Sequence, residues 1–504
     1  MRIVWASVPC SVLLSKLERL ICQCHNDADS HVSNISSNEI LLKYPAFWWA
    51  KDSARLAYLS INNTATPFME IHHFLGGIYP SNVLYPYPKA GSRIPSASLF
   101  VVNLYGPAHT LEMIPPDSQN SRDSYISMVS WISSTRLTVR WLNRVQNQSV
   151  LCVCEATTGA CSEEEPLFTA DGSLFYLILP ANMSKPFQLE SLKTVVELGG
   201  VFHRQCLTCN LFERCSVFKA DFSPNQTYFT LYCLGKITPS LTHKSQVTLP
   251  VSRINIFLIT RNLHPLLIII DSIPGMQSVT EEFALGWPEV LSSLHGVALA
   301  WIDSSSRVSQ GQKSSTLDPR KLSSLRIKDK LGVVEWLMQL PYIDGRRIAV
   351  YGKGLGGYLG LKMLTATDQM FKCAAVMAPI TDFKLYSAAF SERYLGLPNK
   401  EEHSYMAASL LDDIHKLKNK NFLLIHGTAD ARVHFQHSAE LLSRLVKVEA
   451  NYTLQLYPDE GHTLREERTN QHLHRTLLHY LHNCLKYDPF LNIEEEEEED
   501  EEEE

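Results

Sequence analysis

The sequence predicts a chain of two structural classes, a β region followed by an α/β domain. Aromatic strands separated by polar turns recur between about residues 44 and 250. From about residue 264, short apolar runs alternate with stretches of helical spacing. A glycine-rich turn joins one of these runs to a helix, and an aspartate and a histidine follow in later loops. The first two observations set the fold class, and the third bears on function.

The charge of the chain is concentrated at its C-terminus. The 504 residues are 45% hydrophobic and 20% charged, as in an ordinary globular protein, with a formal net charge of -7. Residues 494–504 are all Glu except Asp500, and without these eleven charges the remainder would carry +4. This near balance argues against a basic nucleic-acid binder. For residues 491–504 we expect a solvated, disordered coil.

The β region is built from a repeated unit, in which an aromatic strand is followed by a polar turn and a second strand. The units begin at Trp48, Trp131, Phe168 and Phe222. Their spacing corresponds to one or two periods of about 40–50 residues, the period of propeller blades. A generic β-sandwich is the alternative. Because residues 39–250 hold only about four or five blades, we expect an incomplete β-propeller there, after an irregular segment over 1–38.

Residues 251–490 alternate apolar strands with helices, as in a parallel sheet covered on both faces. The predicted strands are Leu266–Ile270, Val297–Ile302, Arg347–Tyr351, Ala374–Met377, Phe422–Ile425 and Tyr452–Leu456. The predicted helices include Lys330–Leu340, Gly357–Leu364, Gln436–Val446 and Thr469–Leu485.

The turn after strand Arg347–Tyr351 fits two motifs with different chemistry. Gly352, Gly354 and Gly357 satisfy the G-x-G-x-x-G fingerprint, so nucleotide binding is one interpretation. The turn also fits the nucleophile elbow G-x-S-x-G of α/β-hydrolases, with Gly354 at the serine position. The fingerprint normally opens the first βαβ unit, whereas at least two strands come earlier here. The acid that it requires after the next strand would be Asp382, which lies several residues late.

An aspartate and a histidine favour the elbow. In α/β-hydrolases the acid and the base follow the elbow in that order, on loops after later strands. Asp430 follows strand Phe422–Ile425, and His462 follows Tyr452–Leu456. The sequence therefore predicts an α/β-hydrolase domain with glycine in place of the nucleophile. Because glycine has no hydroxyl to deprotonate, we expect the site to be inactive.

Cysteines and glycosylation motifs together indicate an oxidising compartment. Eight of the twelve cysteines form plausible disulfide pairs, namely Cys154 with Cys161, Cys206 with Cys209, Cys215 with Cys233, and Cys373 with Cys484. The second and third pairs could instead form a four-thiolate zinc site. Six N-x-S/T sequons lie at Asn34, Asn62, Asn147, Asn182, Asn225 and Asn451. Because disulfides and N-glycans belong to the same compartments, the sequons favour the disulfides.

The sequence shows neither a membrane span nor a clear signal peptide. No stretch approaches the roughly 18 consecutive apolar residues that a spanning helix needs. Pro9 and Cys10 interrupt the apolar stretch that follows Arg2, and no small-residue cleavage site comes after it.

Several longer motifs carry a family resemblance. They are Tyr85–Gly91, Val102–Pro107, Arg140–Arg144, Gly352–Gly354, Phe390–Gly396, His426–Asp430 and Val433–Gln436. Through them, roughly residues 39–490 resemble the dipeptidyl peptidase IV family of the prolyl oligopeptidase clan, most closely its inactive dipeptidyl peptidase 10 branch. Active members join an eight-bladed propeller to an α/β-hydrolase and remove N-terminal dipeptides after proline or alanine. The chain resembles a truncated form of these proteins, with several blades missing.

The resemblance implies a degenerate catalytic site. It places Gly354, Asp430 and His462 at the triad positions. Ile273 stands where the family has its oxyanion tyrosine, so that hydroxyl is missing as well. Leu355, directly after the nucleophile position, belongs to the same degenerate set.

The resemblance also implies a weakened grip on the substrate. Glu39 matches one of two glutamates that bind the substrate amine, but Asn38 stands at the partner position. Arg432 replaces a substrate-contacting asparagine, and its charge should repel a substrate ammonium. Phe390 replaces a pocket tyrosine, whereas Tyr386 is retained. The four cysteine pairs match the family's disulfides.

The partners implied by the resemblance are proteins. The inactive branch supplies auxiliary subunits of A-type voltage-gated potassium channels, which act through a short cytoplasmic segment and one transmembrane helix. We therefore expect an extracellular-facing domain at the plasma membrane, a homodimer, and no cofactor or metal, although the sequence does not contain the family's anchor. A residual serine-type dipeptidyl peptidase is the alternative, and a nucleotide-binding protein a more distant one.

Overall fold

The computed structural model describes two compact units. It describes residues 46–50, 52–105, 109–115, 123–162, 263–270, 285–302 and 319–486, together with five strands between residues 174 and 235. The first unit comprises residues 1–69, 84–175 and 387–393, and the second comprises residues 70–83, 176–386 and 394–504.

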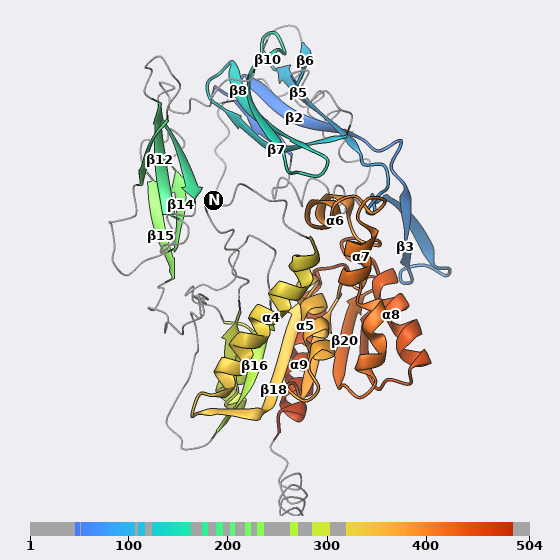
Figure 1. The fold of residues 1–504 in the computed structure, drawn as a ribbon. Helices are drawn as coiled ribbons and strands as arrows, with labels where there is room; N and C mark the ends of the chain where they lie inside the picture. Colours follow the sequence, from blue (N-terminus) through green and yellow to red (C-terminus); the bar gives the residue numbers. More distant parts are fainter. Residues whose placement is uncertain are drawn as a thin grey trace, which may run out of the picture. The chain divides into compact units, whose positions relative to one another are not determined.

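Two four-stranded antiparallel sheets form the first unit (Figure 1). One has the order β1-β2-β5-β6, with β1 at Phe47–Trp49, β2 at Arg55–Asn62, β5 at Ser96–Asn103 and β6 at Thr110–Met113. The other has the order β10-β9-β8-β7, with β7 at Ser124–Trp131, β8 at Arg136–Asn143, β9 at Ser149–Glu155 and β10 at Cys161–Ser162. Four antiparallel strands are the make-up of a propeller blade. The described part of the first unit therefore shows two sheets of the kind predicted for propeller blades.

The aromatic anchors of the repeat lie where strands pair. Trp48 of β1 is opposite Ala57 of β2, and Trp131 of β7 is opposite Leu137 of β8. The Trp131 indole N–H also donates to the backbone oxygen of Trp48 at 3.0 Å, which satisfies its polar group inside an apolar core. The repeat read from the sequence thus reflects packing between the two sheets.

Further β strands follow along the chain. They are β11 (Leu174–Leu179), β12 (Gln188–Thr194), β13 (Phe202–Cys206), β14 (Val217–Phe222) and β15 (Phe229–Gly235). Phe222 is opposite Phe229 in the β14–β15 pair, as the fourth repeat predicts. Phe168, which begins the third repeat, lies outside the described residues.

A six-stranded parallel sheet forms the centre of the second unit. Its order is β17-β16-β18-β19-β20-β21, with β16 at His264–Ile270, β17 at Ala298–Trp301, β18 at Ile343–Lys353, β19 at Cys373–Met377, β20 at Phe422–Gly427 and β21 at Thr453–Tyr457. Each predicted strand is present, and β16, β18, β19 and β20 are apolar and largely buried. This confirms the α/β-hydrolase class.

The described helices are α3 (Trp287–His295), α4 (Pro319–Met338), α5 (Leu355–Ala366), α6 (Ala388–Leu395), α7 (Glu402–Ala408), α8 (Gln436–Lys447) and α9 (Glu467–Cys484), with a 3-10 helix at Leu411–Leu417. Helix α4 begins eleven residues before the predicted Lys330. Its first half is rich in Lys, Arg and Ser, so apolar periodicity does not reveal it. Among the helices that the structure describes, none is long and apolar enough to cross a membrane.

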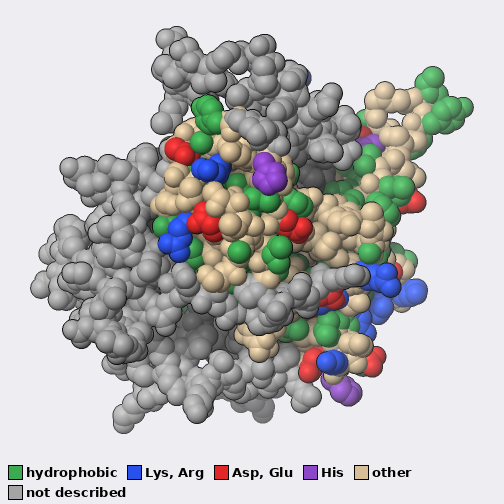
Figure 2. Space-filling model, turned by 90° about the horizontal axis from the view of Figure 1, so that it is seen from above, with side chains coloured by type: hydrophobic (Ala, Val, Ile, Leu, Met, Phe, Trp, Pro, Cys, Tyr) green, Lys and Arg blue, Asp and Glu red, His purple; other side chains and the backbone are tan. Residues whose placement is uncertain are grey.

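A β-hairpin carries exposed apolar side chains. It is formed by β3 (Phe68–His73) and β4 (Ser81–Pro86), and residues 70–83 group with the second unit. The Asp459 carboxylate accepts hydrogen bonds from the backbone N–H groups of Phe74 and Leu75, both at 2.8 Å. Ile78 and Tyr79 beyond them are 95% and 84% exposed. Figure 2 shows hydrophobic side chains gathered on this projecting segment, at the upper right of the view.

Candidate functional site

Close packing explains the glycines of the turn between β18 and α5. A β-carbon at Gly352 would lie 2.3 Å from the backbone of Gly356, and one at Gly356 would lie 2.0 Å from the carbonyl oxygen of Ile270. Gly354 has a φ of +56°, in the left-handed region, and precedes the first residue of α5. Its N–H donates to the Met377 oxygen at 2.9 Å, which ties the turn to β19. The sharp strand-to-helix turn is the geometry of a nucleophile elbow.

Asp430 lies in the loop after β20 and is fully buried. Its Oδ1 accepts hydrogen bonds from the backbone N–H groups of Arg432 and Val433, at 2.8 and 2.9 Å. Burial alone would raise the pKa of Asp430, but the hydrogen bonds and charges of His462 and His426 hold it below its ordinary value. The carboxylate is therefore ionised and fixed in orientation.

His462 lies in the loop after β21, and its Nδ1 is 2.7 Å from Oδ2 of Asp430. Since the aspartate is ionised, Nδ1 carries the proton and Nε2 carries the lone pair. Burial lowers the pKa of His462, Asp430 raises it, and the charges of Lys353 and Arg432 lower it, with a net fall below the ordinary value. The imidazole is thus neutral at pH 7, as a general base requires.

Gly354 faces this imidazole. A β-carbon built at Gly354 would have Cε1 and Nε2 of His462 as its nearest heavy atoms, both at 3.6 Å. The structure therefore brings together Gly354, Asp430 and His462, the three residues singled out from their order in the sequence. It aligns an acid and a base on a position that has no side chain. The arrangement can hold a proton at Nε2, but it offers no hydroxyl nucleophile.

His426 supports this dyad, a role that the sequence did not predict. It is buried, with Nε2 2.8 Å from the Val433 oxygen and Nδ1 2.7 Å from the Ser438 hydroxyl. Nε2 is also 3.5 Å from Oδ2 of Asp430. Its position four residues before Asp430, at the end of an apolar strand, is the only sequence signal that could have found it.

Of the other predicted site residues, the structure describes four and leaves three outside the described residues. Leu355 opens helix α5, and Arg432 lies two residues after Asp430 with an exposed side chain. Tyr386 is buried, with its ring 6.2 Å from that of His437. Phe390 lies on α6, within the segment 387–393 that groups with the first unit. Ile273, Glu39 and Asn38 lie outside the described residues, so their roles stay predictions.

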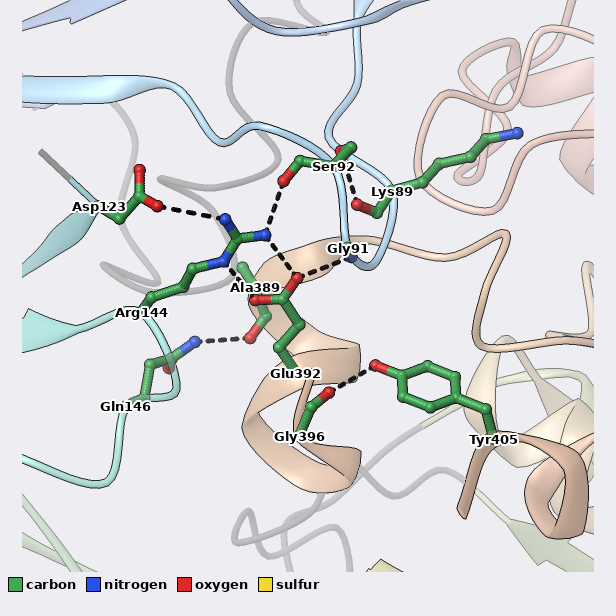
Figure 3. Close-up of polar contacts among 10 residues, drawn as sticks. All are labelled: Lys89, Gly91, Ser92, Asp123, Arg144, Gln146, Ala389, Glu392, Gly396 and Tyr405. Atoms are coloured by element: carbon green, nitrogen blue, oxygen red, sulfur yellow. Dashed lines mark hydrogen bonds and ion pairs between the residues drawn. The ribbon is translucent and has the colours of Figure 1, made fainter. Parts of the chain in front are cut away.

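A buried ion pair fixes segment 387–393 within the first unit (Figure 3). The side chain of Glu392 is fully buried, and the guanidinium of Arg144 binds both of its oxygens at 2.7 Å. The Gly91 N–H donates to the same carboxylate at 2.8 Å. Arg144 further donates to the Ser92 oxygen at 2.6 Å, and Gln146 donates to the Ala389 oxygen at 2.6 Å. Arg144 and Glu392 both lie in motifs of the resemblance, but no pattern in the sequence indicates that they pair.

Two of the four predicted disulfides lie among the described residues. Cys154 is bonded to Cys161, and Cys373 to Cys484. The pairings of Cys206, Cys209, Cys215 and Cys233, and with them the zinc alternative, lie outside the described side chains. Among the residues that the structure describes, no group of three His, Cys, Asp or Glu side chains could hold a metal ion.

Three of the six sequons can be placed. Asn147 and Asn451 are exposed, and so is Asn62, whose side-chain oxygen accepts from the Thr64 hydroxyl. Asn34, Asn182 and Asn225 lie outside the described residues. Glycosylation stays a prediction at all six.

Comparison with known proteins finds the same two parts. Residues 286–488 match the prolyl oligopeptidase family, and residues 31–173 match the dipeptidyl peptidase IV N-terminal region. The inactive dipeptidyl peptidase 10 of Rattus norvegicus is 39% identical, over 89% of this chain and 69% of that protein. The prolyl endopeptidase FAP of Mus musculus is 28% identical, over 89% of this chain and 73% of its own length. The fold also matches the crystal structure of Porphyromonas gingivalis dipeptidyl peptidase 4, with a TM-score of 0.69, 20% identity and coverage of 90% of this chain and 76% of that one.

Proposed function

Because the chain belongs to the dipeptidyl peptidase IV family, we propose that it is a member that is catalytically inactive as a peptidase and acts by binding other proteins. The observation that carries this proposal is Gly354. It occupies the elbow and faces an intact Asp430–His462 dyad, so the base has no hydroxyl to activate. Loss of a triad nucleophile lowers turnover by about 10⁶-fold. The relatives named inactive dipeptidyl peptidase 10 support the same conclusion.

The exposed hairpin of the second unit supports a role in binding. Phe74, Leu75, Ile78 and Tyr79 are all at least 51% exposed and lie on one projecting segment. Contiguous apolar surface of this kind is typical of protein interfaces. The partner that we propose for it is a second copy of the chain.

The wider role that we propose follows the resemblance. The chain is an auxiliary subunit of A-type voltage-gated potassium channels, with its folded units facing the outside of the plasma membrane. Two disulfides support this compartment, because structural disulfides persist in oxidising environments. N-glycosylation at the six sequons belongs to the same proposal.

Co-expression tests the channel role. The full chain, expressed with an A-type channel subunit, should co-purify with it and change the inactivation of its current. A delayed-rectifier potassium channel serves as the control partner. Equal recovery with both channels, or an unchanged A-type current, would reject the channel role.

Sedimentation of the full chain tests the dimer separately. We expect the mass of a dimer, and loss of that mass when Ile78→Glu and Tyr79→Glu are combined. Ile114→Glu is the matched control, because Ile114 is 59% exposed and lies in the first unit. A monomer in the unaltered chain would contradict the proposed use of the hairpin.

The alternative is a residual serine-type peptidase that uses another nucleophile. It differs from the proposed function in one measurable respect, the cleavage of a peptide-like amide.

A further inference from the structure

The imidazole of His462 is held so that its Nε2 faces the side-chain position of residue 354. Nδ1 is occupied by the hydrogen bond to Asp430, at 2.7 Å. Nε2 lies 3.6 Å from where a β-carbon of residue 354 would be. The His462 side chain is 15% exposed. In an active hydrolase a serine hydroxyl stands between this nitrogen and the substrate, whereas here glycine leaves the nitrogen itself facing that space.

The charges around His462 favour a reactive nitrogen. Its pKa is below the ordinary 6.5 because of burial and the positive charges of Lys353 and Arg432, which outweigh Asp430. The neutral ring therefore keeps its Nε2 lone pair at pH 7. The ionised Asp430 stabilises the positive charge that the ring gains when Nε2 forms a bond, as it does for a protonated imidazole in a triad.

We propose that Nε2 of His462 is itself a nucleophile, and that the chain hydrolyses activated aryl esters of small acyl groups through an acyl-histidine. This activity goes beyond the proposed function, because it needs no serine. Nε2 attacks the ester carbonyl, the bond from the carbonyl carbon to the aryloxy oxygen breaks, and the aryloxide leaves with the electron pair. Water then adds to the carbonyl carbon of the cationic acyl-imidazolium and gives up one proton to solvent, the bond to Nε2 breaks with its electron pair returning to Nε2, and the carboxylic acid is released with neutral His462 restored.

The same geometry limits the substrates. Because a β-carbon at residue 354 would lie 3.6 Å from Nε2, the carbonyl carbon that Nε2 attacks would take the place of the missing side chain, and an acetyl ester is a small substrate that tests this. An aryloxide such as p-nitrophenolate leaves without being protonated. An amide must instead expel an amine, which needs a general acid, and His462 cannot supply a proton while Nε2 is acylated. The proposal therefore predicts ester hydrolysis without peptidase activity.

The decisive experiment treats the full chain with p-nitrophenyl acetate at pH 7 and maps the acetyl group by mass spectrometry. We expect a burst of p-nitrophenol and an acetyl adduct on the peptide that contains His462. His462→Gln should remove both the burst and that adduct. His474→Gln, at an exposed histidine of α9, is the matched control and should leave both unchanged. If the unaltered chain carries acetyl groups on surface side chains and none on His462, the proposal is overturned, and no variant is needed to show it.

Substitutions at position 354 provide a second test. Gly354→Ala would place a methyl group 3.6 Å from Nε2, and it should slow acetylation of His462. Gly354→Ser should move the acetyl group from His462 to the new hydroxyl. If His462 only activated water, no adduct would form and the rate would fall in D₂O, because a proton would be transferred in the slow step. That result would contradict a nucleophilic His462. An acetylation rate that is the same in Gly354→Ala and in the unaltered chain would contradict it as well.

The pH profile gives an independent readout. Among the described residues, the charged groups that act on His462 are Asp430, Lys353 and Arg432, and His426 lies 3.5 Å from the same Asp430 oxygen that His462 binds. With these groups in place, the acetylation rate should rise with pH through a value below 6.5 and be level above pH 7. A rate that still rises above pH 8 would point to lysine amines and would overturn the assignment to His462.

Discussion

At the scale of single residues, the catalytic defect begins at Gly354. Its φ of +56° suits glycine, but nucleophilic serines of hydrolase elbows occupy the same strained turn. The space around it would accept a β-carbon at ordinary contact distance from His462. A serine at this position should therefore fold and point its hydroxyl at Nε2.

We predict that Gly354→Ser restores little peptidase activity. Ile273 stands at the predicted oxyanion position, and loss of one oxyanion donor costs about 10²–10³-fold in turnover. The exposed Arg432 should also repel the ammonium group of a substrate. Hydrolysis of Gly-Pro p-nitroanilide by the variant measures this directly. Rates like those of active family members would show that these two substitutions have no effect.

The order of motifs in the sequence was enough to predict the dyad of Asp430 and His462. Loops after neighbouring parallel strands meet at one edge of a sheet, so the order Asp then His fixed where the two side chains would lie. His426 could not be found in this way. Its contribution depends on a 3.5 Å approach to Asp430 within the protein interior, and nothing in the local sequence shows that distance.

At the scale of elements, helix α6 shows what the sequence could not reveal. Its residues follow β19 in the α/β half of the chain, yet 387–393 group with the β unit. The contact that explains this joins Arg144 to Glu392 across 248 residues of sequence. Single-sequence patterns report local periodicity, and long-range pairings of charged residues leave no such trace.

We predict that Arg144→Met destabilises the first unit by about 3–5 kcal/mol, because it leaves the carboxylate of Glu392 buried without a partner. Combining it with Glu392→Met should recover part of this loss, since both charges are then removed. Arg140→Met is the control, because Arg140 is exposed and its guanidinium donates to the Ser149 hydroxyl at 3.1 Å, with no buried carboxylate to leave behind. Urea unfolding of the four proteins measures the differences. Equal losses for Arg140→Met and Arg144→Met would contradict a structural role for the pair.

At the scale of the whole molecule, two disulfides constrain loops of very different length. Cys154 and Cys161 are 7 residues apart, whereas Cys373 and Cys484 are 111 residues apart. A cross-link stabilises a fold mainly by restricting the unfolded chain, and longer loops gain more.

We therefore predict that replacing both Cys373 and Cys484 by Ala lowers the free energy of unfolding of the second unit. The loss should exceed that for Cys154 and Cys161 in the first unit by roughly 2 kcal/mol. Urea unfolding, followed separately in each unit by proteolysis, gives the two values. If removing the Cys154–Cys161 bond lowers the free energy of unfolding more, the entropy of the unfolded chain does not determine how much each disulfide stabilises its unit.

The sequence predicted the class of both units because their signals are periodic. Apolar runs located all six strands of the parallel sheet, and aromatic anchors such as Trp48 and Trp131 located strand pairs of the β unit. The hairpin of β3 and β4 was not predicted, because its exposed Ile78 and Tyr79 follow no buried pattern. Both residues lie between the two strands, where core packing imposes no alternation of buried and exposed side chains.

Gly354 leaves the Asp430–His462 dyad without a nucleophile for peptide bonds. The most direct measurement incubates the full, unaltered chain with Gly-Pro p-nitroanilide, alongside its His462→Gln variant. We predict that both release p-nitroaniline no faster than buffer alone. If the unaltered chain releases p-nitroaniline and His462→Gln does not, the chain is an active peptidase and the dyad has found another nucleophile.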